Sequence, residues 1–297
     1  MANTKSLNLE AGSTQYAYIA DTASLSITGD ITCEAWIKLE SDVSGVIVNK
    51  GGSNAATGGY MFQYNATNSR LDFIWYSGGD GEYSRVYSAW TPVLGQWYHV
   101  VAVVDVDAVA NCIFYIDGVS QGVPTSDSST AASIQDNAAR FEIGVHDSAS
   151  VDDGPSDYFD GLIDEVRIWS DVRTVTEIDN NKSLELDGDE TNLVAYYKFN
   201  DNYEDSQTAG NNDLTASGSP IFSTDIPFGS TSSSTSSSTS SSTSSSSSTS
   251  SSTSSSSSST SSSTSSSTSS STSTISHIVE NFSPRGGIGV IERYGAR

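Results

Sequence analysis

A run of 45 residues, 230–274, consists only of serine and threonine. None of these side chains can enter an apolar core, so nothing offsets the conformational entropy that the tract would lose on folding. We therefore predict a disordered Ser/Thr linker or stalk at 230–274, between a folded domain at 1–229 and a short C-terminal tail at 275–297. The tail is too short to fold alone, and is either a docking segment or the start of a truncated domain.

The 229 residues before the tract suffice for one domain, because all-β sandwiches often reach 200–250 residues. Short alternating runs rich in β-branched and aromatic residues occur at 6–9, 31–39, 60–64, 71–76, 98–104, 112–116 and 193–199. Asp117-Gly118 is a pair typical of tight hairpin turns. Thr174 and Glu177 have capping-box spacing, which predicts one short helix near 171–179. The pattern predicts an all-β fold, a two-sheet antiparallel β-sandwich or jelly roll.

The domain is strongly acidic. The chain has 36 acidic and 13 basic side chains, and the tail holds two Glu and three Arg of these, which leaves 34 acidic and 10 basic residues in 1–229. Such a surface repels phosphate backbones and anionic lipids, so we expect no nucleic-acid partner. The sequence has no run of 18 apolar residues, so we expect no membrane insertion. Acidity favours solubility, and acidic loops also suit Ca²⁺.

Cys33 and Cys112 each share strand parity with apolar neighbours. This parity predicts buried free thiols, with a disulfide between them as the alternative. At the N-terminus, Met1–Lys5 leads directly into a strand pattern and contains no apolar signal-peptide core. The chain therefore follows a removed signal, is exported by another route, or belongs to a virion or other particle. We expect it to be extracellular or at a cell or particle surface.

Four motifs occur in order along the domain: opening strands at 6–19, the strand Ile31–Lys38, the pair Gly95–Val103 with Phe114–Gly118, and the strand Phe159–Trp169. Together they resemble the laminin G-like jelly-roll domains of the concanavalin A-like lectin/glucanase superfamily. The resemblance spans about residues 6–228 and implies a concanavalin A-like jelly roll. It does not imply one activity, because this fold hosts lectins, adhesion modules and hydrolases.

The motif tryptophans Trp36, Trp97 and Trp169 lie in strand-like runs, where we expect them to fill a two-sheet core. Within the last motif the charged residues alternate only imperfectly with Ile163, Val166 and Ile168. We therefore expect that strand to be covered on both faces.

Five aspartates, at 147, 152, 153, 157 and 160, lie in the loop from His146 to Asp160. Hard oxygen ligands on a flexible loop suit Ca²⁺. In pentraxins, relatives on this fold, the equivalent loop supplies calcium ligands, and this resemblance places Asp147 and Asp157 near ligand positions. It also matches Asn54 to an Asn ligand, although Ser53 replaces an acidic residue beside it. The alternative is a solvated acidic loop without metal.

Tyr76, Tyr83, Tyr87 and Trp90 surround the polar stretch Ser77–Gly81. Exposed aromatics beside polar groups can stack on sugars, so Tyr76, Tyr83 and Trp90 are our candidate ligand-binding residues. The alternative is a hairpin in which these residues have one covered face.

Glu185, Asp187 and Glu190 form an E-x-D-x-x-E pattern that resembles the catalytic signature of retaining β-glucanases. Gly188 and the polar residues after it instead indicate a turn, so we assign no catalytic residues. The domain has only His99 and His146 as histidines, which leaves few routes to a nucleophilic triad. We also assign no cofactor-binding residues.

These features predict a non-enzymatic binding or adhesion module displayed on a Ser/Thr stalk. Its expected partner is a glycan or a surface glycoprotein, with Ca²⁺ as a possible aid. The alternative is a structural decoration or receptor-binding domain of a phage or other particle. A glycoside hydrolase is the third hypothesis.

Overall fold

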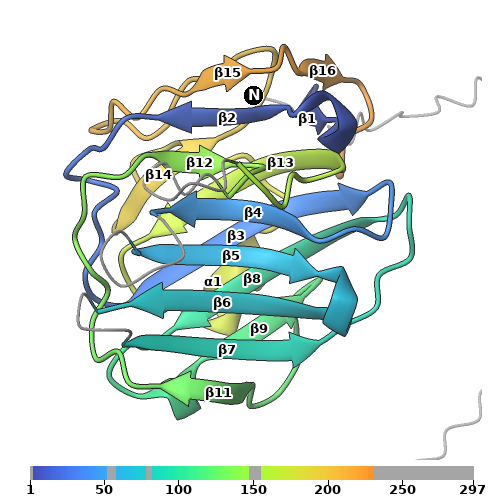
Figure 1. The fold of residues 1–297 in the computed structure, drawn as a ribbon. Coiled ribbons are helices and arrows are strands. Elements are labelled where there is room, and N and C mark those ends of the chain that lie inside the picture. The colour runs from blue at the N-terminus through green and yellow to red at the C-terminus, as the bar shows by residue number, and fades with distance from the viewer. Residues whose placement is uncertain (1–2, 52–57, 78–81, 147–154, 230–297) are drawn as a thin grey trace, which may run out of the picture. The chain divides into compact units, whose positions relative to one another are not determined.

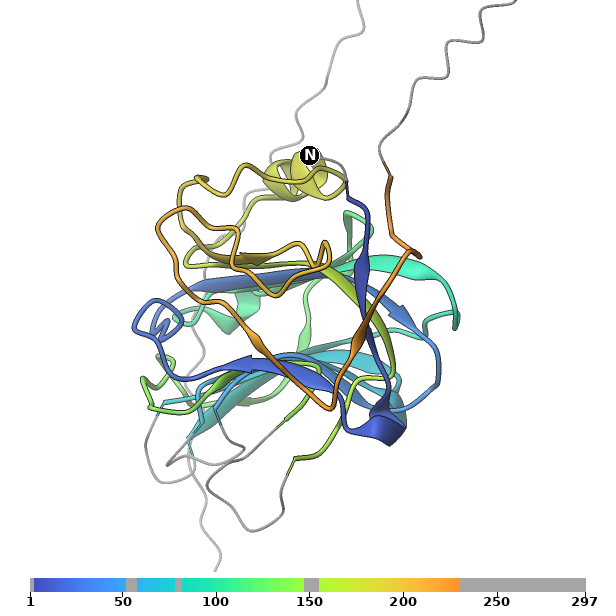
Figure 2. The same cartoon turned by 90° about the horizontal axis from the view of Figure 1, so that it is seen from above.

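The computed structural model describes residues 3–51, 58–77, 82–146 and 155–229. Their strands form two antiparallel sheets of eight strands that stack face to face (Figures 1 and 2). The predicted all-β sandwich is thus confirmed. The predicted Ser/Thr linker and tail lie outside the described residues.

Sheet A lies behind in Figure 1. Its strands are β1 (Ser6–Leu9), β3 (Ile31–Leu39), β8 (Trp97–Val104), β9 (Ile113–Ile116), β10 (Val119–Ser120), β13 (Gly161–Trp169), β14 (Leu193–Tyr197) and β16 (Ile221–Ser223). They run in the order β10-β9-β8-β3-β13-β1-β16, and β14 also pairs with β13.

Sheet B lies in front. Its strands are β2 (Tyr16–Ile19), β4 (Gly45–Lys50), β5 (Tyr60–Asn65), β6 (Arg70–Tyr76), β7 (Tyr83–Ala89), β11 (Thr125–Ser129), β12 (Phe141–Ile143) and β15 (Thr215–Ser217). Their order is β11-β7-β6-β5-β4-β12-β2-β15. Three short 3₁₀ turns, η1 (Ala11–Ser13), η2 (Ala66–Asn68) and η3 (Val109–Asn111), and one helix, α1 (Val175–Asn181), complete the described elements.

Local signals in the sequence correspond to local structure. Asp117 and Gly118, with φ of 53° and 82°, join β9 to β10 as a two-residue turn with the positive dihedrals of type I′. The predicted helix is α1, whose capping box pairs the Thr174 side chain with the Glu177 backbone and the Glu177 side chain with the Thr174 backbone. Both predictions are confirmed.

Alternate strand residues fill the space between the sheets. From sheet A the core takes Cys33, Ala35 and Ile37, and from sheet B it takes Phe73 and Trp75, all completely buried. Cys112 joins the same core, and both thiols are free, as parity predicts. Burial raises the pKa of the Cys33 thiol, because an apolar core disfavours the thiolate.

The expectation that the motif tryptophans fill this core is wrong. Trp36 lies between Ala35 and Ile37, which face inward, so its own side chain points out of sheet A. Trp97 and Trp169 face the same way, and Trp169 packs in a separate cluster with Leu186, Leu193 and Tyr196. Strand alternation already places Trp36 on the face opposite to Ala35 and Ile37.

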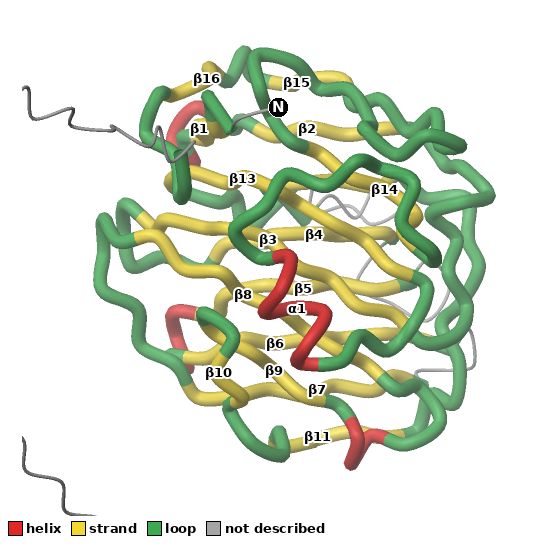
Figure 3. Tube along the Cα trace, turned by 180° about the vertical axis from the view of Figure 1, so that it is seen from behind, coloured by secondary structure: helices red, strands yellow, loops and turns green. Residues whose placement is uncertain are grey.

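Helix α1 covers the outer face of sheet A (Figure 3). Its one buried residue, Ile178, packs on Val101, Val103 and Tyr115 of β8 and β9. Because this face is covered, all nine residues of β13 are buried, and the prediction of a strand covered on both faces is confirmed. No helix in the described part of the chain is long and apolar enough to span a membrane.

Beneath this cover lies a buried polar group, here called the Arg167 cluster. A β-bulge between Asp164 and Arg167, with Glu165 at φ 52°, interrupts the pairing of β13 with β3 and turns several charged side chains to one face. The members of the Arg167 cluster are Glu34, His99, Glu165, Arg167, Trp169 and Tyr196.

Arg167 occupies the middle of the cluster. Its Nη2 lies 2.8 Å from Glu165 Oε2, and its Nη1 lies 3.7 Å from Glu34 Oε1. It also donates to the carbonyls of Asn181, the last residue of α1, and of Leu184, which follows the helix. Burial opposes ionisation of Glu34, but the His99 hydrogen bond and the Arg167 charge outweigh it and lower the pKa of Glu34 to about 2.

Sheet B has its own buried acid on its outer face. Glu142 of β12 is completely buried and accepts a hydrogen bond from Asn49 Nδ2 at 2.8 Å. Arg140 Nη2 lies 3.4 Å from its other carboxylate oxygen. Burial dominates, and it raises the pKa of Glu142 from 4.5 to about 7.

We expect Arg167→Met to lower the free energy of unfolding by about 3–5 kcal/mol, because Glu34 and Glu165 would stay buried without their counter-charge. Lys5→Met is the control, since partly exposed Lys5 and exposed Asp201 form a pair at 3.9 Å that contributes at most about 1 kcal/mol. Urea unfolding of the full chain measures both. Equal small losses in the two variants would contradict the buried-cluster account.

We expect Glu142→Gln to remove part of the pH dependence of stability. The pKa of this carboxyl is about 7 in the folded state and 4.5 in the unfolded state. Its contribution to the stability of the folded state is therefore complete below pH 4.5 and is lost as the pH rises to about 7. The loss corresponds to about 3 kcal/mol. Urea unfolding between these pH values should show a shallower decline for the variant, and parallel curves would refute the assignment.

Candidate functional site

The β6–β7 hairpin brings two of the candidate aromatics together. Tyr76 and Tyr83 are cross-strand partners, and their ring centroids lie 5.9 Å apart. Both rings are half-buried and lie on the outer face of sheet B, because the inward positions are taken by residues such as Trp75 and Val86.

Strand alternation extends this pair into a surface that we call the tyrosine face. Tyr87 stands opposite Asp72, and Arg85 stands opposite Ile74, on the same side of the sheet as Tyr76. The tyrosine face consists of Arg70, Asp72, Ile74, Tyr76, Tyr83, Arg85 and Tyr87.

The charges on the tyrosine face are paired. Arg70 lies 3.8 Å from the centroid of the Tyr87 ring, and its Nε is 2.7 Å from Asp72 Oδ1. Arg85 Nη1 lies 3.3 Å from Asp127 of β11. Burial raises the pKa of Asp72, although the two arginines oppose the shift. Flat rings held beside balanced polar groups can stack on a ligand and hydrogen-bond to it.

Trp90 does not join this group. It follows β7 at the opposite end of the hairpin, where its ring packs edge-on against Tyr64 and Tyr98 at 5.7 and 5.2 Å. Trp90 is seven residue steps from Tyr83 along extended chain, which is about 23 Å at about 3.3 Å per residue. Trp90 is close to the tyrosines in sequence, but the extended strand β7 places it too far away to join them.

The candidate calcium ligands fall mostly beyond the described residues, since Asn54 and Asp147 lie in the undescribed segments 52–57 and 147–154. Asp157 is exposed, with φ of 51°, and its carbonyl accepts the Val46 N–H at 3.0 Å. Within the described ranges, no three His, Cys, Asp or Glu side chains are arranged to hold a metal ion.

The E-x-D-x-x-E pattern forms a turn. The Glu190 carboxylate accepts the backbone N–H groups of Asp187 and Gly188 at 3.0 and 2.9 Å. Glu185 accepts a hydrogen bond from Asn200 Nδ2 at 2.5 Å. These carboxylates stabilise a loop and do not line one face of a strand, so the interpretation as a turn is confirmed.

Asp72 and Arg85 were not among the candidate residues predicted from the sequence. Their signal was the alternation in Arg70–Tyr76 and Tyr83–Ala89, where every second residue is apolar or small and the intervening ones, apart from Ile74 and Ala89, are charged or tyrosine. Following each strand from its tyrosine at a period of two would have found both residues.

Comparison with known proteins identifies the family. A laminin G family model, described as the concanavalin A-like lectin/glucanases superfamily, matches residues 11–179. No curated protein matches this chain significantly.

Solved structures share the fold at low identity. A candidate carbohydrate-binding protein from Bacteroides ovatus is 18% identical with a TM-score of 0.54; the match covers 75% of this chain and 60% of that one. A heptameric pentraxin from Limulus polyphemus is 14% identical with a TM-score of 0.49, and the match covers 74% of this chain and 94% of that one. The Ruminococcus gnavus sialidase module CBM40, bound to sialyllactose, is 9% identical with a TM-score of 0.42, and the match covers 61% of this chain and 97% of that one. The chain belongs to the concanavalin A-like lectin/glucanases superfamily, and its domain has the two-sheet lectin fold.

Proposed function

We propose that the domain is a non-enzymatic module that binds carbohydrate, on a free glycan or a surface glycoprotein, through the tyrosine face. The observation that carries the proposal is the geometry of Tyr76, Tyr83 and Tyr87, three half-exposed rings on one sheet face beside paired charges. Sugar rings present apolar C–H faces and hydroxyl edges, and this surface offers a partner for each. The carbohydrate-binding name of the Bacteroides ovatus relative agrees with the proposal.

The arrangement of acids favours binding over hydrolysis. Asp72 and Glu142 are the buried carboxyls with raised pKa on the outer face of sheet B. Strands β5 and β4 separate β6 from β12, so the two acids stand at least about 14 Å apart at about 4.8 Å per strand. Glycosidases hold their two carboxyls about 5–9.5 Å apart. This pair is therefore too widely spaced for that chemistry.

Display at a cell or particle surface, on the Ser/Thr tract, belongs to the same proposal. Its support is the sequence alone: a run of 45 Ser and Thr residues has the composition of a stalk.

We expect Tyr83→Ala to weaken binding of any glycan found on an array by about tenfold, because a stacking ring is lost. Trp97→Ala is the control, since Trp97 is also a half-buried aromatic but belongs to sheet A. Calorimetric titration of the full chain with that glycan measures the change. Equal binding by Tyr83→Ala and wild type would move the site elsewhere, and an array without any bound glycan would sink the proposal.

Calcium assistance is a separate proposal, supported by the acidic 146–160 segment of the sequence. We expect CaCl₂ to raise the thermal midpoint reversibly with EGTA, since an ion at a hundredfold excess over its Kd adds about 2.7 kcal/mol to stability. Asp157→Ala should reduce the rise, whereas Asp201→Ala, an exposed acid elsewhere, should not. No shift at millimolar calcium would retire the metal site.

A further inference from the structure

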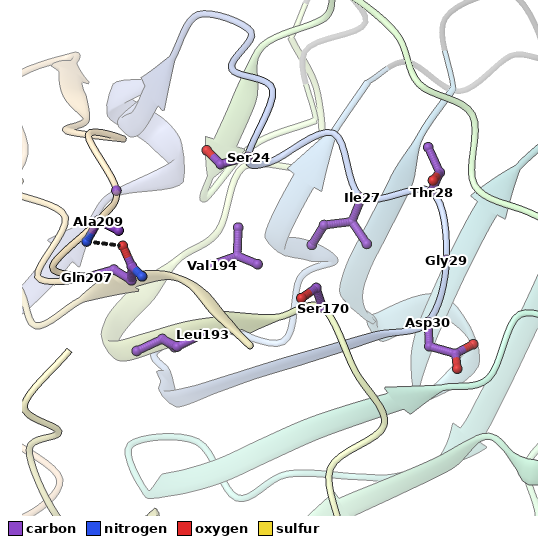
Figure 4. A pocket seen from close by; sticks show the side chains of 11 residues that line it. Ser24, Ile27, Thr28, Gly29, Asp30, Ser170, Leu193, Val194, Gln207 and Ala209 are labelled. Carbon is purple, nitrogen blue, oxygen red and sulfur yellow. Dashed lines mark hydrogen bonds between the residues drawn. The ribbon is translucent and has the colours of Figure 1, made fainter. Parts of the chain in front are cut away.

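A cavity of about 480 Å³ opens where several connections meet (Figure 4). Its walls come from residues 24–30 between β2 and β3, from Ser170 after β13, from the start of β14, and from residues 207–210. None of these residues belongs to the tyrosine face. The volume falls in the range of small-molecule pockets, about 300–1,000 Å³.

Asn212 holds three of these walls together from behind. Its side chain is 1% exposed, and its Oδ1 accepts hydrogen bonds from Thr22 Oγ1 and Ser24 Oγ, both at 2.8 Å. Its Nδ2 donates to Asp205 Oδ2 at 2.8 Å and to the Val194 carbonyl at 3.4 Å. These hydrogen bonds make the cavity preorganised, which lowers the entropy cost of binding a ligand.

The lining mixes apolar and polar groups. Ile27 and Val194 provide apolar surface between polar residues on either side (Figure 4). Asp30 Oδ1 accepts the Val106 N–H at 3.0 Å, and its other oxygen has no hydrogen-bond partner within the described residues. Gln207 Oε1 accepts the Ala209 N–H at 2.8 Å, so the amide NH₂ remains a donor without a partner in the same part of the chain.

The charge of the lining selects among ligand classes. Asp30 is its one charged residue, and no basic side chain is present among the residues that form it. An anion would meet this carboxylate and a domain with 34 acidic against 10 basic residues, so anionic ligands are disfavoured. Most remaining polar groups are hydroxyls, an amide and backbone, which match neutral hydroxyl groups.

We propose that this cavity is a second binding site, which takes one neutral, hydroxyl-rich ring of monosaccharide size. The carboxylate of Asp30 accepts from ligand hydroxyls, the Gln207 amide donates to one, and Ile27 and Val194 pack on the C–H face. A ligand this small, held by a few hydrogen bonds, binds in the millimolar range.

The test is saturation-transfer NMR on the full chain with glucose, galactose, mannose and N-acetylglucosamine, alongside glucosamine and glucuronate. We expect at least one neutral sugar to bind and glucuronate not to bind. Asp30→Asn should weaken that sugar about fivefold to tenfold, because a charge-assisted hydrogen bond becomes a neutral one.

Two matched glycine variants separate occlusion from general damage. A Cβ added at Gly29 or at Gly12 meets nothing within 4 Å, and neither residue needs positive φ. Gly29 lines the cavity, whereas Gly12 lies in η1. Gly29→Phe should abolish binding and Gly12→Phe should preserve it. Should Gly29→Phe fail to fold, Ala209→Phe, at an exposed lining position, takes its place.

Three outcomes overturn the proposal: no neutral sugar binds, glucosamine alone binds, or binding survives occlusion by Gly29→Phe. The variant Tyr83→Ala tests whether this site is distinct from the tyrosine face. We expect it to leave the monosaccharide signal unchanged. A signal lost in Tyr83→Ala and kept in Gly29→Phe would assign the sugar to the tyrosine face instead.

Discussion

The guanidinium of Arg167 compensates buried negative charge on the outer face of sheet A. It lies between Glu34 of β3 and Glu165 of its own strand, and it donates to the carbonyls of Asn181, the last residue of α1, and of Leu184 just after it. Without it, two buried carboxylates would lack their cation, and the segment after the helix would lose its attachment to the sheet. Because β13 pairs with β1, β3 and β14, a disturbance there reaches the centre of sheet A.

This arrangement leaves the two sheets with different roles. On the outer face of sheet A, α1 packs through Ile178, and Trp169 and the Arg167 cluster are buried. Sheet B keeps half-exposed tyrosines on β6 and β7. The binding surface that we propose lies on sheet B, and its position depends on the core that the two sheets enclose.

The elements that the sequence predicts are those whose signals come from neighbouring residues. The β3 strand, the Asp117-Gly118 turn and the α1 capping box depend on neighbouring residues, and the sequence predicts all three. Polar edge strand β11, whose five residues are Thr, Ser or Asp, carries no such pattern and was not predicted. Strands from distant parts of the chain decide which charges become buried, so the Arg167 cluster and the hydrogen bonds of Asn212 could not be predicted from the sequence. Of the candidate site, the Tyr76–Tyr83 pair was predictable, whereas its partners Asp72 and Arg85 were overlooked and Trp90 was misplaced by strand length.

We propose that the outer face of β6 and β7 contacts glycan. The most direct test of this contact is an amide chemical-shift map of the full chain, titrated with a glycan that binds on an array. The account predicts shifts concentrated in residues 70–76 and 83–89, with little change in α1 and β13. Shifts confined to sheet A, or to strands far from β6 and β7, would contradict it.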